Sequence, residues 1–244
     1  MKKFTKVALI IATIVGVIGI CCLFGAVSMG LTWGTFADMV DDGKLSFSID
    51  GKAEGSITDV EEAFESLDVE LSSGKLEICY ADVDKVQVEQ EETPEFKCYV
   101  KDGTLHVEGG QRLGVNNHRA SIVIRIPQNY SFAEFELEVG AGEATVDGVI
   151  AREASIDVGA GKASVTQLDA KEVDTSAGAG ELYLEVVGKK EDYSYNLECG
   201  IGELKVGEDS YSGLGSEQKI KNPDAKRSLD AECGIGKIQI DFSE

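Results

Sequence analysis

Carboxylates dominate the side chains that could do chemistry in this sequence. The chain of 244 residues has 44 Asp and Glu against 23 Lys and Arg, for a formal net charge of -21. Paired carboxylates can cleave glycosidic bonds, and a carbohydrate-active β-helix enzyme at the cell surface is the alternative function that we consider. The histidines do not complete such a site, because His106 points outward in an expected strand and His118 lies in a polar loop beside Arg119. Since no Gly-x-Ser-x-Gly nucleophile motif occurs either, we predict a non-enzymatic protein with no catalytic residues.

Pairs of glycines separated by one residue recur through the second half of the chain. A phosphate-binding loop would need Gly-x-Gly-x-x-Gly at the start of a helix. The third glycine position is instead held by Thr145, Ser164, Tyr183, Lys205 and Gln239. We therefore predict no bound nucleotide and interpret the pairs as structural corners, in which glycine adopts a positive φ that is costly for other residues. These structural turns are Gly140, Gly142, Gly159, Gly161, Gly178, Gly180, Gly200, Gly202, Gly234 and Gly236.

Clustered carboxylates could also form a calcium site, because hard cations prefer oxygen ligands. Against this reading, the calcium-binding pattern Gly-Gly-x-Gly-x-Asp is absent, and no Cys-x-x-Cys pair or Cys/His cluster indicates zinc. We predict no metal and no cofactor. When the segments are aligned by their glycines, two acidic columns point outward: Glu138, Asp157, Ser176, Glu198 and Glu232, and Glu136, Ser155, Asp174, Asn196 and Asp230.

The elements that must position these residues come from an internal repeat. Residues 135–146 read as strand, Gly-x-Gly turn and strand, and four further copies occupy 154–165, 173–184, 195–206 and 229–240. The first glycines follow one another at steps of 19, 19, 22 and 34 residues, the last step containing an expected loop at 207–227. Such a repeat is typical of a solenoid in which each unit packs against the next. We predict an all-β, β-solenoid-like stack, with a two-sheet β-sandwich as the alternative.

The first part of the repeat region follows the same pattern with drift. Residues 67–78 fit the template with Ser72 in place of the first glycine, so we expect an early divergent rung. Apolar residues at alternate positions predict further strands at 86–88, 96–100, 104–107 and 121–126.

Two kinds of column should face inward because they hold small or aliphatic residues. Cys199 and Cys233 share one of them and would be neighbours about 4.8 Å apart if the rungs stack in register. A disulfide between them is conceivable, although two reduced core thiols are favoured. A further column, directly after the second glycine, mixes charges: Glu143, Lys162, Glu181, Glu203 and Lys237. The inward columns are Val139, Val158, Ala177, Cys199 and Cys233, and the pairs Ala144/Val146, Ala163/Val165, Leu182/Leu184, Leu204/Val206 and Ile238/Ile240.

The N-terminal segment predicts a membrane anchor. Residues 7–37 carry no charge, whereas Lys2, Lys3 and Lys6 precede them and Asp38 follows. The apolar stretch is long enough to cross a bilayer, and the positive-inside bias places the N-terminus in the cytoplasm. The expected organisation is a cytoplasmic N-terminus at 1–6, a single-pass transmembrane helix at 7–33, a connector at 34–66 and an extracytoplasmic β-repeat domain at 67–244.

Two alternatives for this segment stay open. A cleavable signal peptide would also begin with basic residues, but its apolar core is usually shorter. A lipoprotein signal ending at Cys21 would require a small residue where Ile20 stands. In either case, an acidic domain outside the membrane will not bind nucleic acid by charge.

The turn motifs carry a family resemblance. Acidic alternating strands closed by Gly-Ala-Gly, or by Cys199-Gly-Ile-Gly202 and Cys233-Gly-Ile-Gly236, behind one N-terminal span resemble the bacterial putative-adhesin family, also described as toastrack domains of cell-envelope stress systems. The resemblance covers about residues 67–242. It implies a stacked β-repeat ectodomain with a role in adhesion or envelope signalling, and an envelope protein or cell-wall polymer as partner. It supplies no catalytic residues.

Overall fold

The computed structural model describes residues 56–91, 93, 96–110, 120–211 and 215–243. The predicted cytoplasmic N-terminus and transmembrane helix, most of the predicted connector and His118 lie outside these residues. Residues Phe47–Glu244 form one compact unit, and only this unit is described below. Within the described residues, no helix has the length and apolar character that crossing a membrane requires.

The regular elements of the described residues are strands, apart from one short 3-10 turn, η2 (Lys190–Asp192), so the predicted all-β class is confirmed. The strands are β1 (Ser56–Asp59), β2 (Ser66–Leu71), β3 (Lys75–Ala81), β4 (Gln87–Glu91), β5 (Lys97–Lys101), β6 (Thr104–Gly109), β7 (Ser121–Pro127), β8 (Ser131–Val139), β9 (Glu143–Val158), β10 (Lys162–Asp169), β11 (Glu172–Ala177), β12 (Glu181–Val187), β13 (Tyr193–Cys199), β14 (Glu203–Val206), β15 (Asp209–Ser210), β16 (Ser216–Ile220), β17 (Arg227–Cys233) and β18 (Lys237–Ser243).

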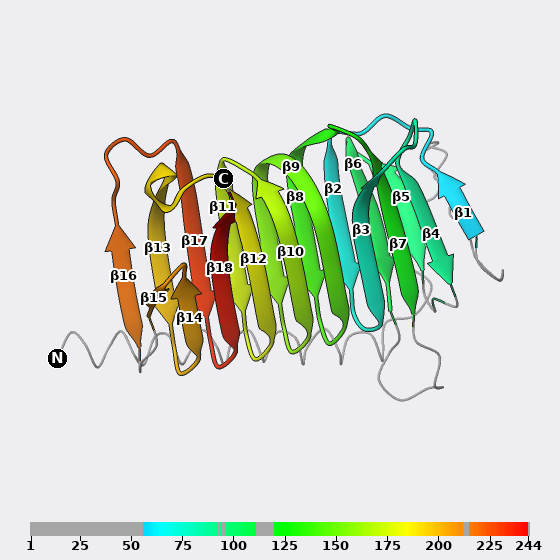
Figure 1. The fold of residues 1–244 in the computed structure, drawn as a ribbon. Helices are drawn as coiled ribbons and strands as arrows, with labels where there is room; N and C mark the ends of the chain where they lie inside the picture. The colour runs from blue at the N-terminus through cyan, green and yellow to red at the C-terminus, as the bar shows by residue number, and fades with distance from the viewer. Residues whose placement is uncertain (1–55, 92, 94–95, 111–119, 212–214, 244) are drawn as a thin grey trace. The chain divides into compact units, whose positions relative to one another are not determined.

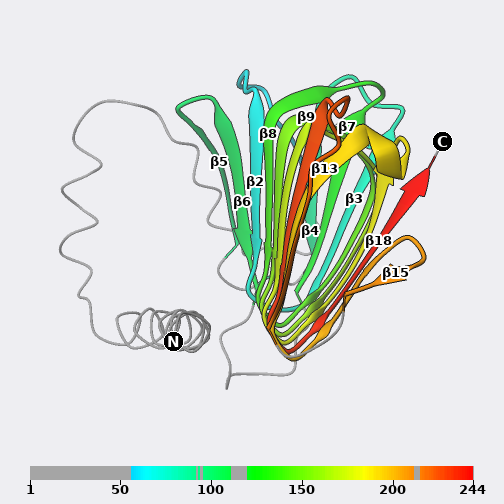
Figure 2. The ribbon, with the colours of Figure 1, turned by 90° about the vertical axis from the view of Figure 1, so that its left-hand side faces the viewer.

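These strands form two faces that meet along the Gly-x-Gly turns and diverge away from them (Figures 1 and 2). We call the faces sheet 1 and sheet 2. Long β9 belongs to both, since its first half pairs in sheet 2 and its second half in sheet 1. Sheet 1 has the order β5, β6, β2, β8, β9, β11, β17, β13, β16. Sheet 2 has the order β1, β4, β7, β3, β9, β10, β12, β18, β14, β15.

The chain path is that of a solenoid, as predicted. From β8 to β12 it runs along sheet 1, turns at a Gly-x-Gly corner, returns in sheet 2 and crosses back to sheet 1 one rung further on. Within β9 this crossing begins at Gly148, whose φ is +84°. The predicted early rung is also present, because β2 and β3 pair in register with β8 and β9.

The core lies between the two sheets and consists of the predicted inward columns. Val139, Val158 and Ala177 are each at most 1% exposed, and the paired columns after the turns are buried as well. Burial of each large aliphatic side chain is worth roughly 1.5–3 kcal/mol. The alternation of apolar and polar residues therefore fixes which side of every strand faces inward.

The order of the rungs differs from their order in the chain. The last repeat, β17 and β18, lies between the third and the fourth, because β17 pairs with both β11 and β13. The step of 22 residues between Gly178 and Gly200 provides the longer crossing, through Gly188 and η2, that carries the fourth repeat past the intervening position. At the other end, β2 and β3 similarly lie between the later strands β6 and β7 and the first repeat.

Antiparallel strands cover both ends of the stack. The segment 207–227, expected to be a loop, contains β15 and β16, which pair with β14 and β13. Strands β4 and β5 have the same place at the other end. Strand β1 pairs with β4 although Ser56–Asp59 lies in the segment predicted as connector, so the sheet begins earlier than expected. These strands occupy parallel edges that could otherwise pair with another chain.

The expectation that the corner glycines need a positive φ is wrong. Among the described residues, none of the ten corner glycines has one. Glycine is required because successive turns touch: a Cβ on Gly161 would lie 2.4 Å from the carbonyl oxygen of Gly142, and a Cβ on Gly236 would lie 2.1 Å from that of Gly180. The first glycine of a pair has more room, with 3.0 Å between a Cβ on Gly159 and the carbonyl oxygen of Gly140.

This geometry predicts different costs for two similar substitutions. We expect Gly161→Ala to lower the free energy of unfolding by about 1–3 kcal/mol, because the added methyl group separates two rungs. Gly159→Ala should cost less than half as much. Chemical denaturation of the purified variants, followed by circular dichroism, measures both. Equal losses, or a larger loss for Gly159→Ala, would show that crowding between turns does not explain these glycines.

Candidate functional site

The outer surface of sheet 1 carries the predicted acidic columns, and we call it the acidic face. Because the strands are in register, outward carboxylates of neighbouring rungs lie side by side, as in Glu70 beside Glu138 and Glu138 beside Asp157. In spatial order, the row nearest the turns is Glu108, Glu70, Glu138, Asp157, Ser176, Glu232, Glu198 and Glu217. The next row is His106, Asp68, Glu136, Ser155, Asp174, Asp230, Asn196 and Lys219.

The crowding of carboxylates changes their protonation. Partial burial, followed by the charges of Glu70 and Asp157, raises the pKa of Glu138. Burial and neighbouring carboxylates likewise raise the pKa values of Glu70, Glu136 and Asp174. In the middle of the acidic face, burial and the neighbouring carboxylates outweigh the described cations, such as Lys97 near Glu70, and a positively charged partner would relieve the remaining repulsion.

At the end of the acidic face formed by β5 and β6, side chains of the chain itself offset the negative charge. Lys97 Nζ lies 2.7 Å from Glu108 Oε2, and the Tyr99 hydroxyl donates a hydrogen bond of 2.9 Å to Glu108 Oε1. Although burial opposes it, these two contacts lower the pKa of Glu108. His106 is half-buried, stacks on Tyr99 and has its Nδ1 2.7 Å from Asp68 Oδ2. His106 is thus engaged within the sheet and does not face a substrate cleft.

A shallow depression of about 310 Å³ lies in the acidic face over β9, β11, β17 and β13. Its lining combines Ser155, Ser176 and Asn196 with carboxylates of both rows, including Asp157, Asp174 and Asp230. The Asn196 Oδ1 atom is buried there without a hydrogen-bond partner. Within the described ranges, no group of three or more His, Cys, Asp or Glu residues is arranged to hold a metal ion. The depression offers negative charge and hydrogen-bond acceptors on a rigid surface.

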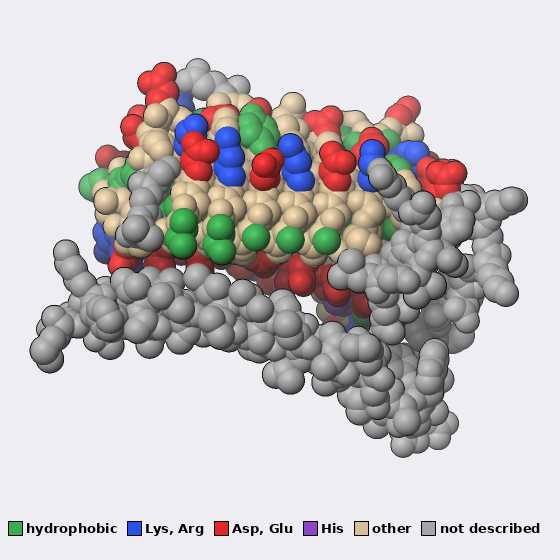
Figure 3. Space-filling view, turned by 90° about the horizontal axis from the view of Figure 1, so that it is seen from below, with side chains coloured by type: hydrophobic (Ala, Val, Ile, Leu, Met, Phe, Trp, Pro, Cys, Tyr) green, Lys and Arg blue, Asp and Glu red, His purple; other side chains and the backbone are tan. Residues whose placement is uncertain are grey.

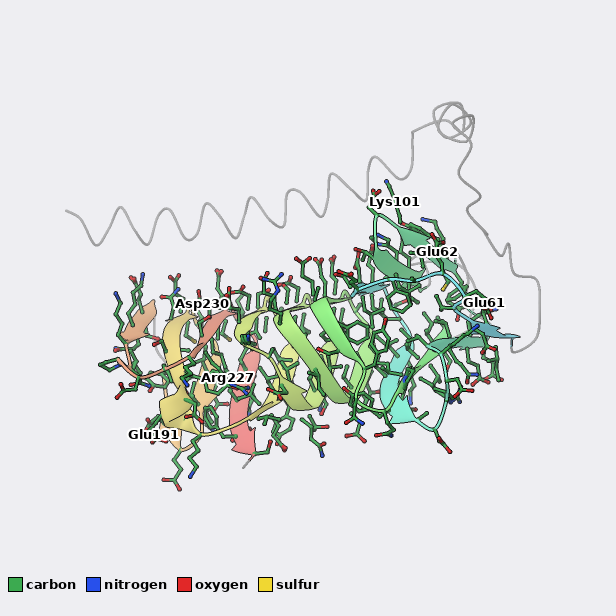
Figure 4. The ribbon with its side chains drawn as sticks, turned by 90° about the horizontal axis from the view of Figure 1, so that it is seen from above. Glu61, Glu62, Lys101, Glu191, Arg227 and Asp230 are labelled. Atoms are coloured by element: carbon green, nitrogen blue, oxygen red, sulfur yellow. The ribbon has the colours of Figure 1, made fainter. Side chains whose placement is uncertain are left out.

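Arg227 fixes the inserted repeat at the opposite end of its strand from the turns. Its Nη1 atom lies 2.8 Å from Asp169 Oδ1, and it donates hydrogen bonds of 3.2 Å to the Ala170 carbonyl and 3.1 Å to the Val187 carbonyl. Figure 4 shows Arg227 between the two sheets, whereas Asp230 of the same strand lies on the outer side. One side chain therefore ties the start of β17 to the rungs beside it.

The cysteine column is as predicted, and its two members are adjacent. Cys199 pairs in register with Cys233, and both are buried free thiols. The Cys233 thiol donates to the Gly236 carbonyl at 3.2 Å. Burial, with Cys199 beside it, raises the pKa of Cys233 to about 12. Such a thiol is a weak nucleophile at neutral pH and serves as core packing.

The line of turns forms a second surface, which we call the turn edge. Figure 3 shows an apolar stripe along it, beside a row in which acidic and basic side chains alternate. The stripe consists of the central turn residues Ala141, Ala160, Ala179, Ile235 and Ile201, with the two isoleucines 64% and 68% exposed. In spatial order the charged row is Lys75, Glu143, Lys162, Glu181, Lys237 and Glu203.

The strict alternation of this row was not evident from the sequence. In chain order Glu181 is followed by Glu203, which gives the mixed column described above. The inserted repeat places Lys237 between these two glutamates. The charges of these residues thus follow no regular order along the chain, but their signs alternate strictly in space.

The raised pKa values predict how stability depends on pH. A carboxyl group whose pKa is higher in the folded than in the unfolded chain binds more protons when folded, so stability falls as pH rises through that range. We expect the thermal midpoint to rise when pH is lowered from 7 towards 4.5, the ordinary value for Glu. Groups with a lowered pKa, such as Glu108, change the stability of the folded chain only below pH 4.5.

A quadruple variant with Glu70→Gln, Glu136→Gln, Glu138→Gln and Asp174→Asn should flatten this dependence between pH 7 and 4.5. Differential scanning calorimetry across that range measures the slope. If the variant kept the slope of the unaltered protein, the carboxylates of the acidic face would not be its source.

Comparisons with known proteins bear on the family. The model of the family Toastrack DUF4097 matches residues 64–242. Searching the curated proteins returns no match. Solved structures with similarity include a putative cell adhesion protein from Clostridium sporogenes, at 19% identity over 79% of this chain and 100% of that chain, with a TM-score of 0.49. A putative adhesin from Bacteroides fragilis has 13% identity, coverages of 78% and 98% and a TM-score of 0.37.

A putative lipid binding protein from Parabacteroides distasonis has 12% identity, coverages of 80% and 99% and a TM-score of 0.34. The names of these proteins refer to adhesion and lipid binding. The family match covers most of the chain and all of its turns. This chain belongs to the Toastrack DUF4097 family.

Proposed function

We propose that this protein is a membrane-anchored, extracytoplasmic and non-enzymatic binding or scaffold module, acting in surface adhesion or in cell-envelope stress signalling. The anchor is inferred from the uncharged segment 7–37 between Lys6 and Asp38. The single-pass topology would place the N-terminus in the cytoplasm and the β-repeat domain outside the membrane.

The acidic face is the observation that carries the binding role. It extends across the rungs of sheet 1, its strands are locked in register, and Glu70, Glu136, Glu138 and Asp174 have raised pKa values. A surface of this kind favours a partner that presents positive charge, because association relieves repulsion that the chain itself leaves in place. The partner class is an envelope protein or a cell-wall polymer, and not a nucleic acid.

The described residues support binding more than catalysis. His106 is engaged with Asp68 and Tyr99, and the buried Cys233 has a pKa of about 12. No described nucleophile lies in a cleft with a positioned base and a group to orient it, the arrangement on which covalent catalysis depends.

Binding assays with the immobilised full chain test this proposal. We expect retention of a cell-wall polymer fraction, which would favour adhesion, or of one membrane protein from a detergent extract, which would favour signalling. A variant of the acidic face, Glu138→Gln, Asp157→Asn, Glu232→Gln and Glu198→Gln, should lose at least about tenfold in affinity.

A matched control neutralises four outward carboxylates of sheet 2, through Glu77→Gln, Asp147→Asn, Glu185→Gln and Asp241→Asn. This control should bind like the unaltered protein. The proposal fails if neither fraction is retained, or if both variants bind equally well.

A further inference from the structure

We infer that the turn edge is a self-association surface, on which a second copy of this chain docks through a two-fold axis. The inference does not depend on the binding role of the acidic face. It starts from the six charged residues of the turn edge, whose signs alternate from Lys75 at one end to Glu203 at the other.

A row of alternating charges with an even number of members is complementary to its own reverse. When it is reversed and laid against itself, every lysine meets a glutamate. A two-fold axis perpendicular both to the strands and to the row, passing between Lys162 and Glu181, would place Lys162 opposite Glu181 of the second copy. The same axis would place Glu143 opposite Lys237 and Lys75 opposite Glu203 of that copy. Two-fold interfaces require such self-complementarity, because the same patch is used on both subunits.

Other arrangements of the two rows are electrostatically unfavourable, because they bring like charges together. A parallel arrangement would place Lys opposite Lys and Glu opposite Glu at every position, and a shift by one rung would do the same within the reversed arrangement. Like-charge contacts of this kind exclude wrong registers. The row therefore specifies one orientation and one register for a second copy.

The apolar stripe supplies exposed hydrophobic surface that this interface would bury. Ile201 and Ile235 are 68% and 64% exposed, the highest values among the large apolar side chains that the structure describes. They lie at one end of the stripe, whereas small alanines occupy the other. Reversal brings Ile235 against Ala141 of the second copy, so that a large side chain meets a small one. Apolar burial supplies affinity, and the charges supply orientation.

The size of the edge sets the expected strength. Six rungs spaced by about 4.8 Å give a row about 24 Å long, which belongs to the smaller class of specific interfaces. We therefore expect reversible dimers with a dissociation constant in the micromolar range, about 1–100 µM.

Two single charge reversals, tested alone and mixed, examine this arrangement. Lys162→Glu would bring two glutamates together at each of two symmetric contacts, and Glu181→Lys would bring two lysines together. Each variant alone should dimerise at least about tenfold more weakly than the unaltered chain. In an equal mixture, Glu at position 162 of one chain meets Lys at position 181 of the other, and the second contact is the native pair. Mixing should restore association to within a few-fold.

The measurement is sedimentation velocity of the full chain in detergent at up to about 100 µM, with one variant fluorescently labelled so that mixed dimers are counted. Lys171→Glu, the same charge change at an exposed position between β10 and β11, is the matched control and should leave association unchanged. Thermal unfolding confirms that each variant is folded.

A monomeric wild-type chain at the highest concentration would overturn the inference, and the turn edge would then dock a different molecule or none. Dimerisation that neither charge reversal weakens would also overturn the inference, since such dimers would form through another surface such as the N-terminal segment. Failure of the mixture to recover would exclude the two-fold arrangement, even if each single reversal weakened association.

Discussion

Direct contact between the backbones of successive turns is the constraint on which this fold depends. The Lys162 amide donates to the Gly142 carbonyl at 2.9 Å, and a Cβ on Gly161 would collide with that same carbonyl oxygen. Turns that touch in this way hold neighbouring rungs at one spacing and in one register. Since a slip by one residue would turn every apolar side chain outward, the turns and the core enforce the same alignment.

A fixed register has opposite electrostatic consequences on two surfaces. On the acidic face it stacks carboxylate on carboxylate, which adds to partial burial in raising the pKa of Glu138. On the turn edge it places lysine beside glutamate, with Lys162 Nζ 3.4 Å from Glu181 Oε2 and Lys237 Nζ 3.4 Å from Glu203 Oε2. Exposed pairs of this kind add little stability. Their regularity matters more for recognition, so the acidic face suits a cationic partner and the turn edge suits a second copy.

The sequence predicted the strands of the repeats, the side of each that faces the core and the contact between Cys199 and Cys233, because these depend on local alternation and on a repeat aligned by its glycines. It did not predict the end strands β1, β15 and β16. It did not predict the order of the rungs. Nearly equivalent repeats offer nearly equivalent packing surfaces, so strand pattern alone does not say which repeats are neighbours. Two signals were present: the 22-residue step before Gly200, and the like-charged Glu181 and Glu203 that chain order would place side by side. The positive φ expected at the corners failed for a different reason, since glycine is needed there for contacts between rungs, which a single turn sequence does not contain.

An intrachain disulfide can report the position of the last repeat in the stack. The Ile235 amide donates to the Gly178 carbonyl at 2.7 Å, so Ala179 and Ile235 occupy adjacent turns, whereas Ala179 and Ile201 are separated by one rung. A disulfide requires Cα atoms no more than about 7 Å apart, which adjacent rungs meet and alternate rungs exceed. We expect Ala179→Cys combined with Ile235→Cys to form a disulfide under mild oxidation, detected by peptide mapping, and Ala179→Cys combined with Ile201→Cys to form none. Efficient linking of 179 to 201, without linking of 179 to 235, would mean that the repeats stack in chain order and not in the order described above.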